Sequence, residues 1–502
     1  MAGPFPTELW ESIFAHFECP MPPDKWWYYG SQYDVSSLKD LASLALVCRA
    51  FRPIAQHFMY GTLLADGFRD DQKCKRLLAQ SMAENPRLGA YVRRACISDW
   101  GHGSAKGVDF GRVLAREDVS DRAKRWLEVM MMEYAALEWN AQLFALMPNL
   151  EVVDVSVFMD AGHLAGLLSG RRDVERMVRA EAEVRQEMGY LYDDEEGEME
   201  KKIPTILSDE TLAENALPQL KEVRLRHADC TDGSLGISDI EAILLHPGLE
   251  RLHLLGFDWT SFGLDKAKWP LYPNPTLQML DLRECLVDAY SLSNIFARFH
   301  NLHTLHIILG DSRRESSSGR YSREQGSWDV NLTDIGTLLR RHGQNLISFE
   351  LHTPEYNSFS LAEGRLGSLA PMTSLRHLKI VENDLTGRRT RSYVSESYAT
   401  LPLEDVLPAG LETLYLHFDD EYSEPCPADE QLFEILKRTV SSGRFPDLRE
   451  IKVERYLNDP TKKLEPEIEG WKVCVNEVHL WGRPSSSGCM RTVIELSRLG
   501  DE

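Results

Sequence analysis

The stretch "HPGLERLHLLG", residues 246–256, contains the pattern from which the architecture of most of the chain can be predicted. Leu249 is followed by Leu252 and Leu254, which gives the frame L-x-x-L-x-L. Apolar and other residues alternate toward the end of this frame, and such alternation is typical of a β-strand with one buried face. The first leucine is expected to close the turn that leads into the strand.

The same frame recurs along most of the chain. Including the phrase at 246, its leading residues are Leu150, Leu220, Leu249, Leu277, Leu302, Leu346, Leu375, Leu411 and Leu448. Weaker copies are expected at Val92–Ala95–Ile97 and at Val475–Val478–Leu480. Each phrase predicts one short strand.

Helix signals lie between these phrases. Ser238 and Glu241 resemble a capping box, and Thr333 precedes an amphipathic run that ends at Gly343. A third amphipathic run, "DEQLFEILKRTVSSG", covers residues 429–443. Strand, turn and helix in regular repetition predict a curved solenoid with a parallel sheet on its concave side.

Several of the leading leucines are 25 to 29 residues apart. In frame and spacing the phrases resemble irregular leucine-rich repeats. The resemblance implies an α/β chain in which a leucine-rich-repeat solenoid carries a parallel sheet on its concave face. The alternative is a compact α/β domain whose strands are unrelated to one another.

The N-terminal region predicts three short helices before the repeats. The first covers "FPTELWESIFAHF", residues 5–17, where Pro6 and Thr7 suit a helix start. The second begins near Ser37, which forms a capping-box pattern with Asp40. The third begins near Arg49, because this start places Pro53 in the first turn, where the missing N–H has no helical partner.

These helices resemble the F-box, a module that docks on the Skp-family adaptor of cullin-based ubiquitin ligases. The residues that carry the resemblance are Pro6, Glu8, Leu9, Ile13, Phe14, Asp40, Leu41, Val47, Cys48, Arg49 and Phe51. The chain departs from the family in a long insertion at 18–36 and in Phe51, where the family usually has tryptophan. The resemblance implies adaptor contacts among Pro6, Leu9, Ile13, Phe14, Leu41, Val47 and Phe51, with some of these residues in the internal core. The alternative is that the three helices only cap the next domain.

The domain organisation follows from these patterns. Residues 1–63 form the F-box-like module, residues 64–146 a helical connector with the first weak repeat, and residues 147–502 the solenoid. A charged insertion is expected at 171–203, where Asp193 to Glu200 includes six acidic residues in eight, and a flexible loop at 311–327.

Composition excludes several classes of function. The 502 residues carry a formal net charge of −22, which disfavours binding to phosphate backbones, and no apolar run approaches the length of a membrane span. The nine cysteines are scattered without a CxxC motif, which suits a reducing compartment, either cytoplasm or nucleus. No catalytic motif is present, so we expect no enzyme activity, cofactor or metal in this chain; an α/β enzyme is the least favoured class.

The polar positions of the strands indicate where a target is expected to bind. They are Asp154, Ser156, Arg224, Arg226, His253, Leu255, Asp281, Arg283, His306, Ile308, Glu350, His352, Lys379, Val381, Tyr415, His417, Lys452 and Glu454, with five basic and four acidic residues and four histidines. The candidate target-binding residues are Arg224, Arg226, Arg251, His253 and Arg283, a basic patch suited to carboxylates or a phosphate. The alternative is that Asp281 pairs with one of these arginines.

Taken with the resemblance, the sequence predicts a substrate-recognition subunit of an SCF-type ubiquitin ligase. Its partners would be a Skp-family adaptor, a cullin scaffold reached through that adaptor, and an unknown protein target, with neither nucleic acid nor membrane. The alternative is a non-catalytic leucine-rich-repeat binding scaffold that takes no part in ubiquitination.

Overall fold

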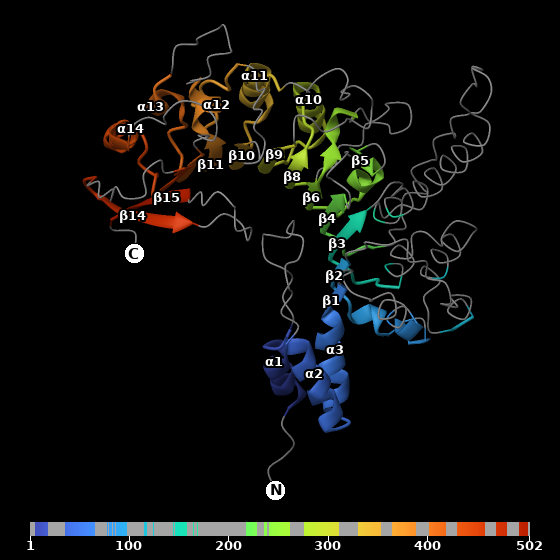
Figure 1. Cartoon of the computed structure of the whole chain (residues 1–502). Coiled ribbons are helices and arrows are strands. Elements are labelled where there is room, and N and C mark those ends of the chain that lie inside the picture. The colour runs from blue at the N-terminus through green and yellow to red at the C-terminus, as the bar shows by residue number, and fades with distance from the viewer. Residues whose placement is uncertain are drawn as a thin grey trace, which may run out of the picture. The chain divides into compact units, whose positions relative to one another are not determined.

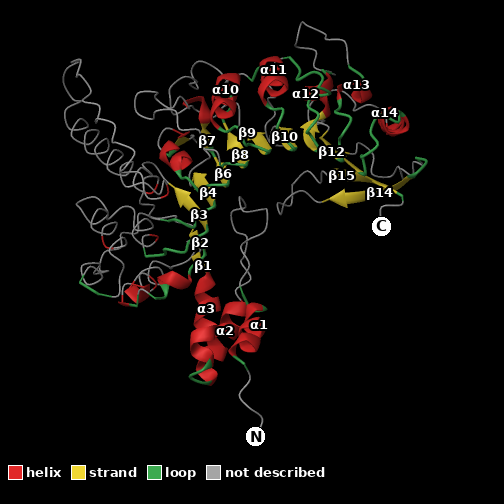
Figure 2. Cartoon of the chain, turned by 180° about the vertical axis from the view of Figure 1, so that it is seen from behind, coloured by secondary structure: helices red, strands yellow, loops and turns green. Residues whose placement is uncertain are grey.

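The structure, a computed structural model, is mixed α/β with mostly parallel strands (Figures 1 and 2). It describes residues 6–18, 36–65, 87–97, 146–157, 217–227, 235–237, 240–261, 276–310, 330–352, 364–387, 401–417, 429–456, 468–478 and 491–499, and scattered residues between 78 and 168. The chain divides into two units. The first contains Met1–Cys230, Ile237–Leu255 and Leu264–Thr276; the second contains Thr231–Gly236, Gly256–Gly263 and Leu277–Glu502.

Three helices open the first unit: α1 (Thr7–Ala15), α2 (Ser36–Val47) and α3 (Phe51–Gly61). Phe14, Leu41, Ile54 and Ala55 form their buried core, against which Trp10 and Phe17 pack. Pro53 is the third residue of α3, as expected from the missing N–H. Helix α1 begins at Thr7, so the start expected at Pro6 and Thr7 is confirmed, although its N-cap Pro6 makes no side-chain bond. The cap expected at Ser37 is wrong, because Ser37 lies inside α2.

The third helix continues directly into a sheet. β1 (Thr62–Ala65) follows Gly61 without a linker and pairs with β2 (Arg94–Ile97). The short 3-10 helix η1 (Gly89–Tyr91) precedes β2. The first unit continues with β3 (Val152–Val157), β4 (Glu222–His227) and β6 (Arg251–Leu255), and all its neighbouring strands are parallel. The weak repeat at Val92–Ala95–Ile97 therefore forms a parallel strand, whereas β1 has no counterpart in the sequence predictions.

Six parallel strands form the main part of the second unit. They are β8 (Met279–Cys285), β9 (Thr304–Leu309), β10 (Ser348–His352), β11 (His377–Val381), β12 (Thr413–His417) and β13 (Glu450–Tyr456), adjacent in chain order. Five helices lie on one side of them in both views (Figures 1 and 2): α10 (Ala289–Arg298), α11 (Leu332–His342), α12 (Glu382–Thr386), α13 (Leu403–Val406) and α14 (Asp429–Ser441). The opposite side carries the polar positions of the strands.

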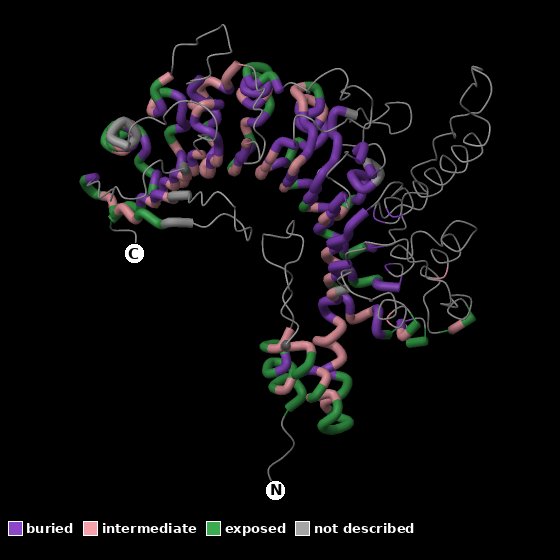
Figure 3. Tube along the Cα trace, in the orientation of Figure 1, coloured by how far each residue is buried: buried purple, intermediate pink, exposed green. Residues whose placement is uncertain are grey.

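Each leucine frame contributes one strand whose apolar residues are buried (Figure 3). Leu252 and Leu254 of β6 are 1% and 0% exposed, and Leu378 and Ile380 of β11 are 2% and 0% exposed. In all nine phrases, the apolar residues at the second and third frame positions are buried, and the strand that carries them pairs in parallel with a neighbouring strand of the same unit. This prediction is therefore confirmed.

The second unit ends with two antiparallel strands. β15 (Arg491–Arg498) pairs with β13 on one side and with β14 (Trp471–Val478) on the other. The weak repeat expected at Val475–Val478–Leu480 does not continue the parallel series, because β14 pairs with the antiparallel strand β15 rather than with β13, and Val475, the leading residue of the frame, is 38% exposed.

The helix boundaries correct several local expectations. The run after Ser238 forms the short 3-10 helix η4 (Glu241–Leu245), and its N-cap Ile240 makes no side-chain bond. Helix α11 is capped by Asn331, one residue before its start, rather than by Thr333, while Gly343 is its C-cap as expected. Three further short elements complete the second unit: β5 (Leu235–Gly236), β7 (Phe257–Asp258) and η5 (Trp259–Ser261).

The insertions predicted at 171–203 and 311–327 lie outside the described residues. Of the insertion predicted at 18–36, only residues 18 and 36 are described. Most of the predicted connector at 64–146 lies outside them too. Within the part of the chain that the structure describes, no helix has the length and apolarity needed to cross a membrane.

The buried frame leucines predict a large stability effect. We expect Leu254→Ala to lower the free energy of unfolding by ~2–5 kcal/mol, because the side chain is fully buried and the alanine leaves a cavity. Urea unfolding measures this loss. The matched control is Leu499→Ala, at a side chain that is 63% exposed, which should change stability by less than ~0.5 kcal/mol. Equal effects of the two substitutions would contradict the burial of the frame.

Candidate functional site

Helix α1 has two apolar faces. Phe14 is 1% exposed and belongs to the core, whereas Leu9 and Ile13 are 47% and 43% exposed. Leu9 and Ile13 are four residues apart, so they lie one turn above each other on the same side of the helix. The helix therefore buries one apolar row inside the chain and leaves a second row at the surface.

Helix α2 ends in a second exposed apolar segment. Leu46 and Val47 are 88% and 65% exposed, although Leu41, earlier in the same helix, is fully buried. Among the described residues, the other exposed large hydrophobic side chains are those of Tyr290, Ile347, Val475 and Leu499. Half of these exposed apolar side chains thus belong to two short helices, which makes these helices candidates for an interaction site.

The seven predicted adaptor residues divide into two groups. Pro6, Leu9, Ile13 and Val47 are exposed. Phe14 and Leu41 are core residues, and the ring of Phe51 lies 4.5 Å from that of Trp10 and 5.3 Å from that of Phe14, centroid to centroid. The sequence prediction missed Leu46. The signal that identifies it is its position, which is out of phase with the row formed by the buried Leu41 and the partly buried Leu38.

The predicted basic residues of the first unit are bound to carboxylates. The Arg226 Nη2 atom lies 2.7 Å from Asp154 Oδ1, with both side chains buried. The Arg224 Nε atom donates to Glu222 Oε1 at 2.6 Å, and the Arg251 Nε atom lies 2.8 Å from Glu222 Oε2. The His253 Nε2 atom lies 3.5 Å from the same carboxylate.

These pairs correct the predicted basic patch. Arg226, His253 and Arg283 are 4%, 7% and 7% exposed, so they are not available as a surface for a target. Arg283 belongs to the second unit and makes its ion pairs there, with Asp281 and Glu350, so the pairing of Asp281 with an arginine is confirmed. Of the five residues, only Arg251 keeps a largely accessible side chain, at 48% exposure.

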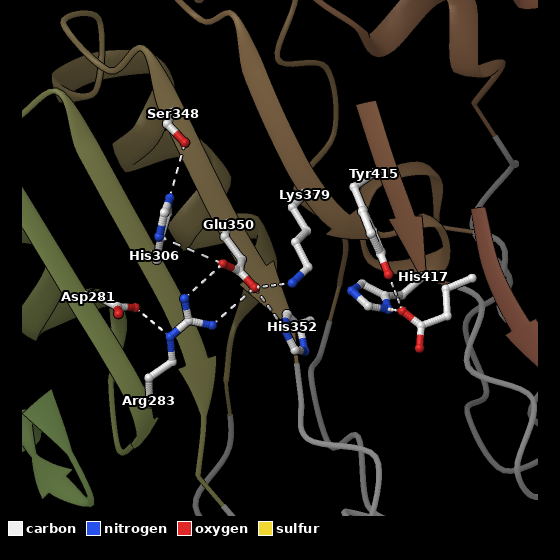
Figure 4. Close-up of polar contacts among 10 residues, drawn as sticks. Asp281, Arg283, His306, Ser348, Glu350, His352, Lys379, Tyr415 and His417 are labelled. Carbon is white, nitrogen blue, oxygen red and sulfur yellow. Dashed lines mark hydrogen bonds and ion pairs between the residues drawn. The ribbon is translucent and has the colours of Figure 1, made fainter. Parts of the chain in front are cut away.

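A chain of alternating charges crosses the polar side of the second unit (Figure 4). The Arg283 Nε atom lies 2.5 Å from Asp281 Oδ1, and its Nη1 and Nη2 atoms donate to the two oxygens of Glu350 at 3.2 and 3.1 Å. The Lys379 Nζ atom lies 2.7 Å from Glu350 Oε1. Two carboxylates and two cations thus neutralise one another across β8, β10 and β11.

Aromatic and imidazole rings continue this face toward β13 (Figure 4). The His352 and His417 ring centroids are 4.7 Å apart, and Tyr415 and His417 are equally close. The Tyr415 hydroxyl donates to Glu454, and the His417 Nδ1 atom lies 3.3 Å from the same carboxylate. The face is therefore polar, partly buried and internally paired.

Burial shifts the pKa values on this face in different directions. Burial alone would raise the pKa of Glu350, but the hydrogen bond with His352 and the charges of Arg283 and Lys379 hold it well below 4.5. Burial lowers the pKa of His306 below 6.5, more than Glu350 and Asp281 raise it. In the first unit, burial raises the pKa of Asp154 despite Arg226 and Arg224.

The lowered pKa of His306 predicts a pH effect. A folded-state pKa below the unfolded value means that the stabilisation from neutral His306 is present above pH 6.5 and is lost as the pH falls below it. The stability advantage of the parent chain over His306→Gln should therefore shrink between about pH 7.5 and about pH 5.5, as measured by urea unfolding at both values. An advantage that stays constant or grows on acidification would contradict the neutral histidine.

Among the described residues, no group of three or more His, Cys, Asp or Glu side chains is arranged to hold a metal ion. The described residues do include exposed apolar side chains on α1 and α2, and polar side chains along the strands of both units. No protein-family model matches the chain, and no curated protein matches its sequence.

Proposed function

We propose that the chain is the substrate-recognition subunit of an SCF-type ubiquitin ligase. In this proposal α1, α2 and α3 are the F-box that binds a Skp-family adaptor, and the parallel strands belong to an irregular leucine-rich-repeat solenoid that binds the protein target. Partner subunits supply the catalysis, and this chain supplies proximity and orientation.

The observation that carries the proposal is the division of the F-box-like residues. The apolar positions needed for a three-helix core, such as Phe14 and Leu41, are buried. Leu9, Ile13 and Val47, which the resemblance assigns to the adaptor, are apolar and exposed without serving that core. A module that merely capped the sheet would have no reason to expose these side chains to water, since burying each would gain ~1.5–3 kcal/mol.

The connection between the helices and the sheet supports the same function. The last residue of α3, Gly61, is followed at once by the first residue of β1. Glu18 forms an ion pair with Arg94 of β2, and the His57 ring of α3 lies 5.3 Å from the ring of Tyr91. A partner bound to α1 and α2 would therefore be held in a defined position relative to the strands of the first unit.

The test is the order of assembly with purified subunits. The chain and a cullin scaffold should not coelute on size-exclusion chromatography until a Skp-family adaptor is added. A chain that never enters this complex, although it is folded by circular dichroism, would instead support the alternative of a leucine-rich-repeat scaffold outside ubiquitination.

A further inference from the structure

The two oxygens of the buried Glu350 are occupied unequally (Figure 4). Oε1 accepts from Arg283 Nη1 at 3.2 Å and lies 2.9 Å from His352 Nε2 and 2.7 Å from Lys379 Nζ. Oε2 accepts from Arg283 Nη2 at 3.1 Å. Each carboxylate oxygen offers about two acceptor positions, so Oε1 is crowded, whereas Oε2 can accept one more hydrogen bond.

His306 of β9 lies next to the less occupied oxygen. Its Nδ1 atom is 3.8 Å from Glu350 Oε2, which is too long for a hydrogen bond, and its Nε2 atom is 3.1 Å from Ser348 Oγ. A neutral imidazole carries one ring proton, and we assign it to Nε2, where the Ser348 hydroxyl oxygen accepts it. A second proton would go to Nδ1 and create a new donor beside Oε2.

The surroundings of His306 allow it to gain a proton while Glu350 stays ionised. The described charged and titratable groups that face it come from β8, β10 and β11: Asp281, Arg283, Glu350, His352 and Lys379. Burial lowers the pKa of His306 below 6.5, so the imidazole is neutral at neutral pH. The pKa of Glu350 lies well below 4.5 despite its burial. Mild acid therefore charges the histidine beside a carboxylate that keeps its own charge.

Protonated His306 is a third cation on one carboxylate, so the weakest existing contact should break. Arg283 is held by two carboxylates, and its side chain is 8% exposed. The Lys379 side chain is 34% exposed, and its described ion pair is with Glu350 alone. Its Nζ atom also lies 5.0 Å from the centroid of the Tyr415 ring. This ammonium can exchange the carboxylate for water and remain over the ring, whereas the buried guanidinium cannot.

We propose that His306 is a pH switch for the polar side of the second unit: its protonation forms a hydrogen bond from Nδ1 to Glu350 Oε2 and releases Lys379 from Oε1. Acidification then leaves an accessible ammonium group on this side of the strands. The inference concerns the second unit alone, and it holds or fails independently of the proposed function.

Removal of the lysine charge at two pH values measures the release. Lys379→Met keeps the length of the side chain, and urea unfolding of the full chain gives the equilibrium constant for folding. At about pH 7.5 the substitution should lower this constant about two- to fivefold, as expected for a partly exposed ion pair. At about pH 5 it should have almost no effect, because protonated His306 already occupies the carboxylate.

Lys452→Met is the matched control. The Lys452 side chain is 35% exposed, and its Nζ atom lies 3.0 Å from Glu450 Oε1 and 3.6 Å from Glu495 Oε1. Among the described contacts, no histidine reaches either of these carboxylates. Lys452→Met should therefore lower the folding constant by a similar factor at both pH values.

His306→Gln identifies the group that titrates. Glutamine keeps a hydrogen-bonding side chain but cannot be protonated, so Lys379→Met in this background should have the same effect at both pH values. His306→Asn serves the same purpose if His306→Gln does not fold, and the comparison of the two lysines in the parent chain needs neither variant. Three results would overturn the proposal: an equal effect of Lys379→Met at both pH values in the parent chain, no effect at about pH 7.5, or a pH dependence that persists without His306.

Discussion

The double variant Leu9→Asp, Ile13→Asp is expected to bind a Skp-family adaptor at least a hundredfold more weakly than the parent chain. Anchors buried at an interface typically contribute ~2–4 kcal/mol each, and every ~1.4 kcal/mol is a factor of ten. Both side chains are close to half exposed in the free chain, so the aspartates should not disturb its core. Isothermal titration calorimetry with the purified adaptor measures the loss.

Leu499→Asp is the matched control for this variant, because Leu499 is an exposed leucine outside the helices, at 63% exposure. It should bind the adaptor as the parent chain does, and both proteins should keep the parent's circular dichroism and thermal midpoint. If the double variant kept full affinity for the adaptor, the exposed row of α1 would not be the docking surface.

Arg283→Ala is expected to destabilise the second unit by ~3–5 kcal/mol. Its side chain is 8% exposed and lies between two buried carboxylates, those of Asp281 and Glu350. Removing the arginine leaves both without their shared cation in a poorly hydrated site. Lys379 would still pair with Glu350. Among the described contacts, however, Lys379 makes no ion pair with Asp281. Urea unfolding monitored by circular dichroism measures the loss.

Arg449→Ala provides the comparison. Arg449 also pairs with a glutamate, but both side chains are substantially exposed, at 57% and 26%, so the loss should be ~0–1 kcal/mol. A similarly small loss for Arg283→Ala would contradict the buried ion network. The same reasoning excludes charge reversal at Arg226 or Arg283 as a probe of target binding, because the variant would lose stability first.

The strands were predictable because their signal is local. Alternation in a frame such as that of Leu252 and Leu254 requires only neighbouring residues, and one buried face is enough to explain it. The same alternation also predicted which residues share the polar side, as the register of Asp281, His306 and Glu350 confirms. Strand β1 was missed because its four residues carry no frame.

The charged side chains were less predictable, because their state depends on the neighbouring strand. Arg226 and Arg251 are both arginines on strands of the same sheet, but Arg226 meets Asp154 and is buried, whereas Arg251 stays accessible at the strand start. Which carboxylate lies opposite each arginine depends on the register between segments that are tens of residues apart. Sequence spacing gives the face of a strand but not this pairing.

The helices show the same limit on a smaller scale. Spacing identified Phe14, Leu41 and Phe51 as apolar positions, and the resemblance grouped them with Leu9 and Val47. Periodicity cannot distinguish two apolar rows on one helix, since each has helical spacing. Only the packing of α1 against α2 and α3 separates the core row from the exposed row.

Hydrogen–deuterium exchange of the full chain, with and without a purified Skp-family adaptor, locates the surface that the adaptor covers. We expect slower exchange in peptides that cover α1 and the end of α2, residues 7–18 and 41–50, with no comparable change in β8 to β13. Adaptor binding that protected only the strands, or no protection at a saturating adaptor concentration, would contradict this expectation.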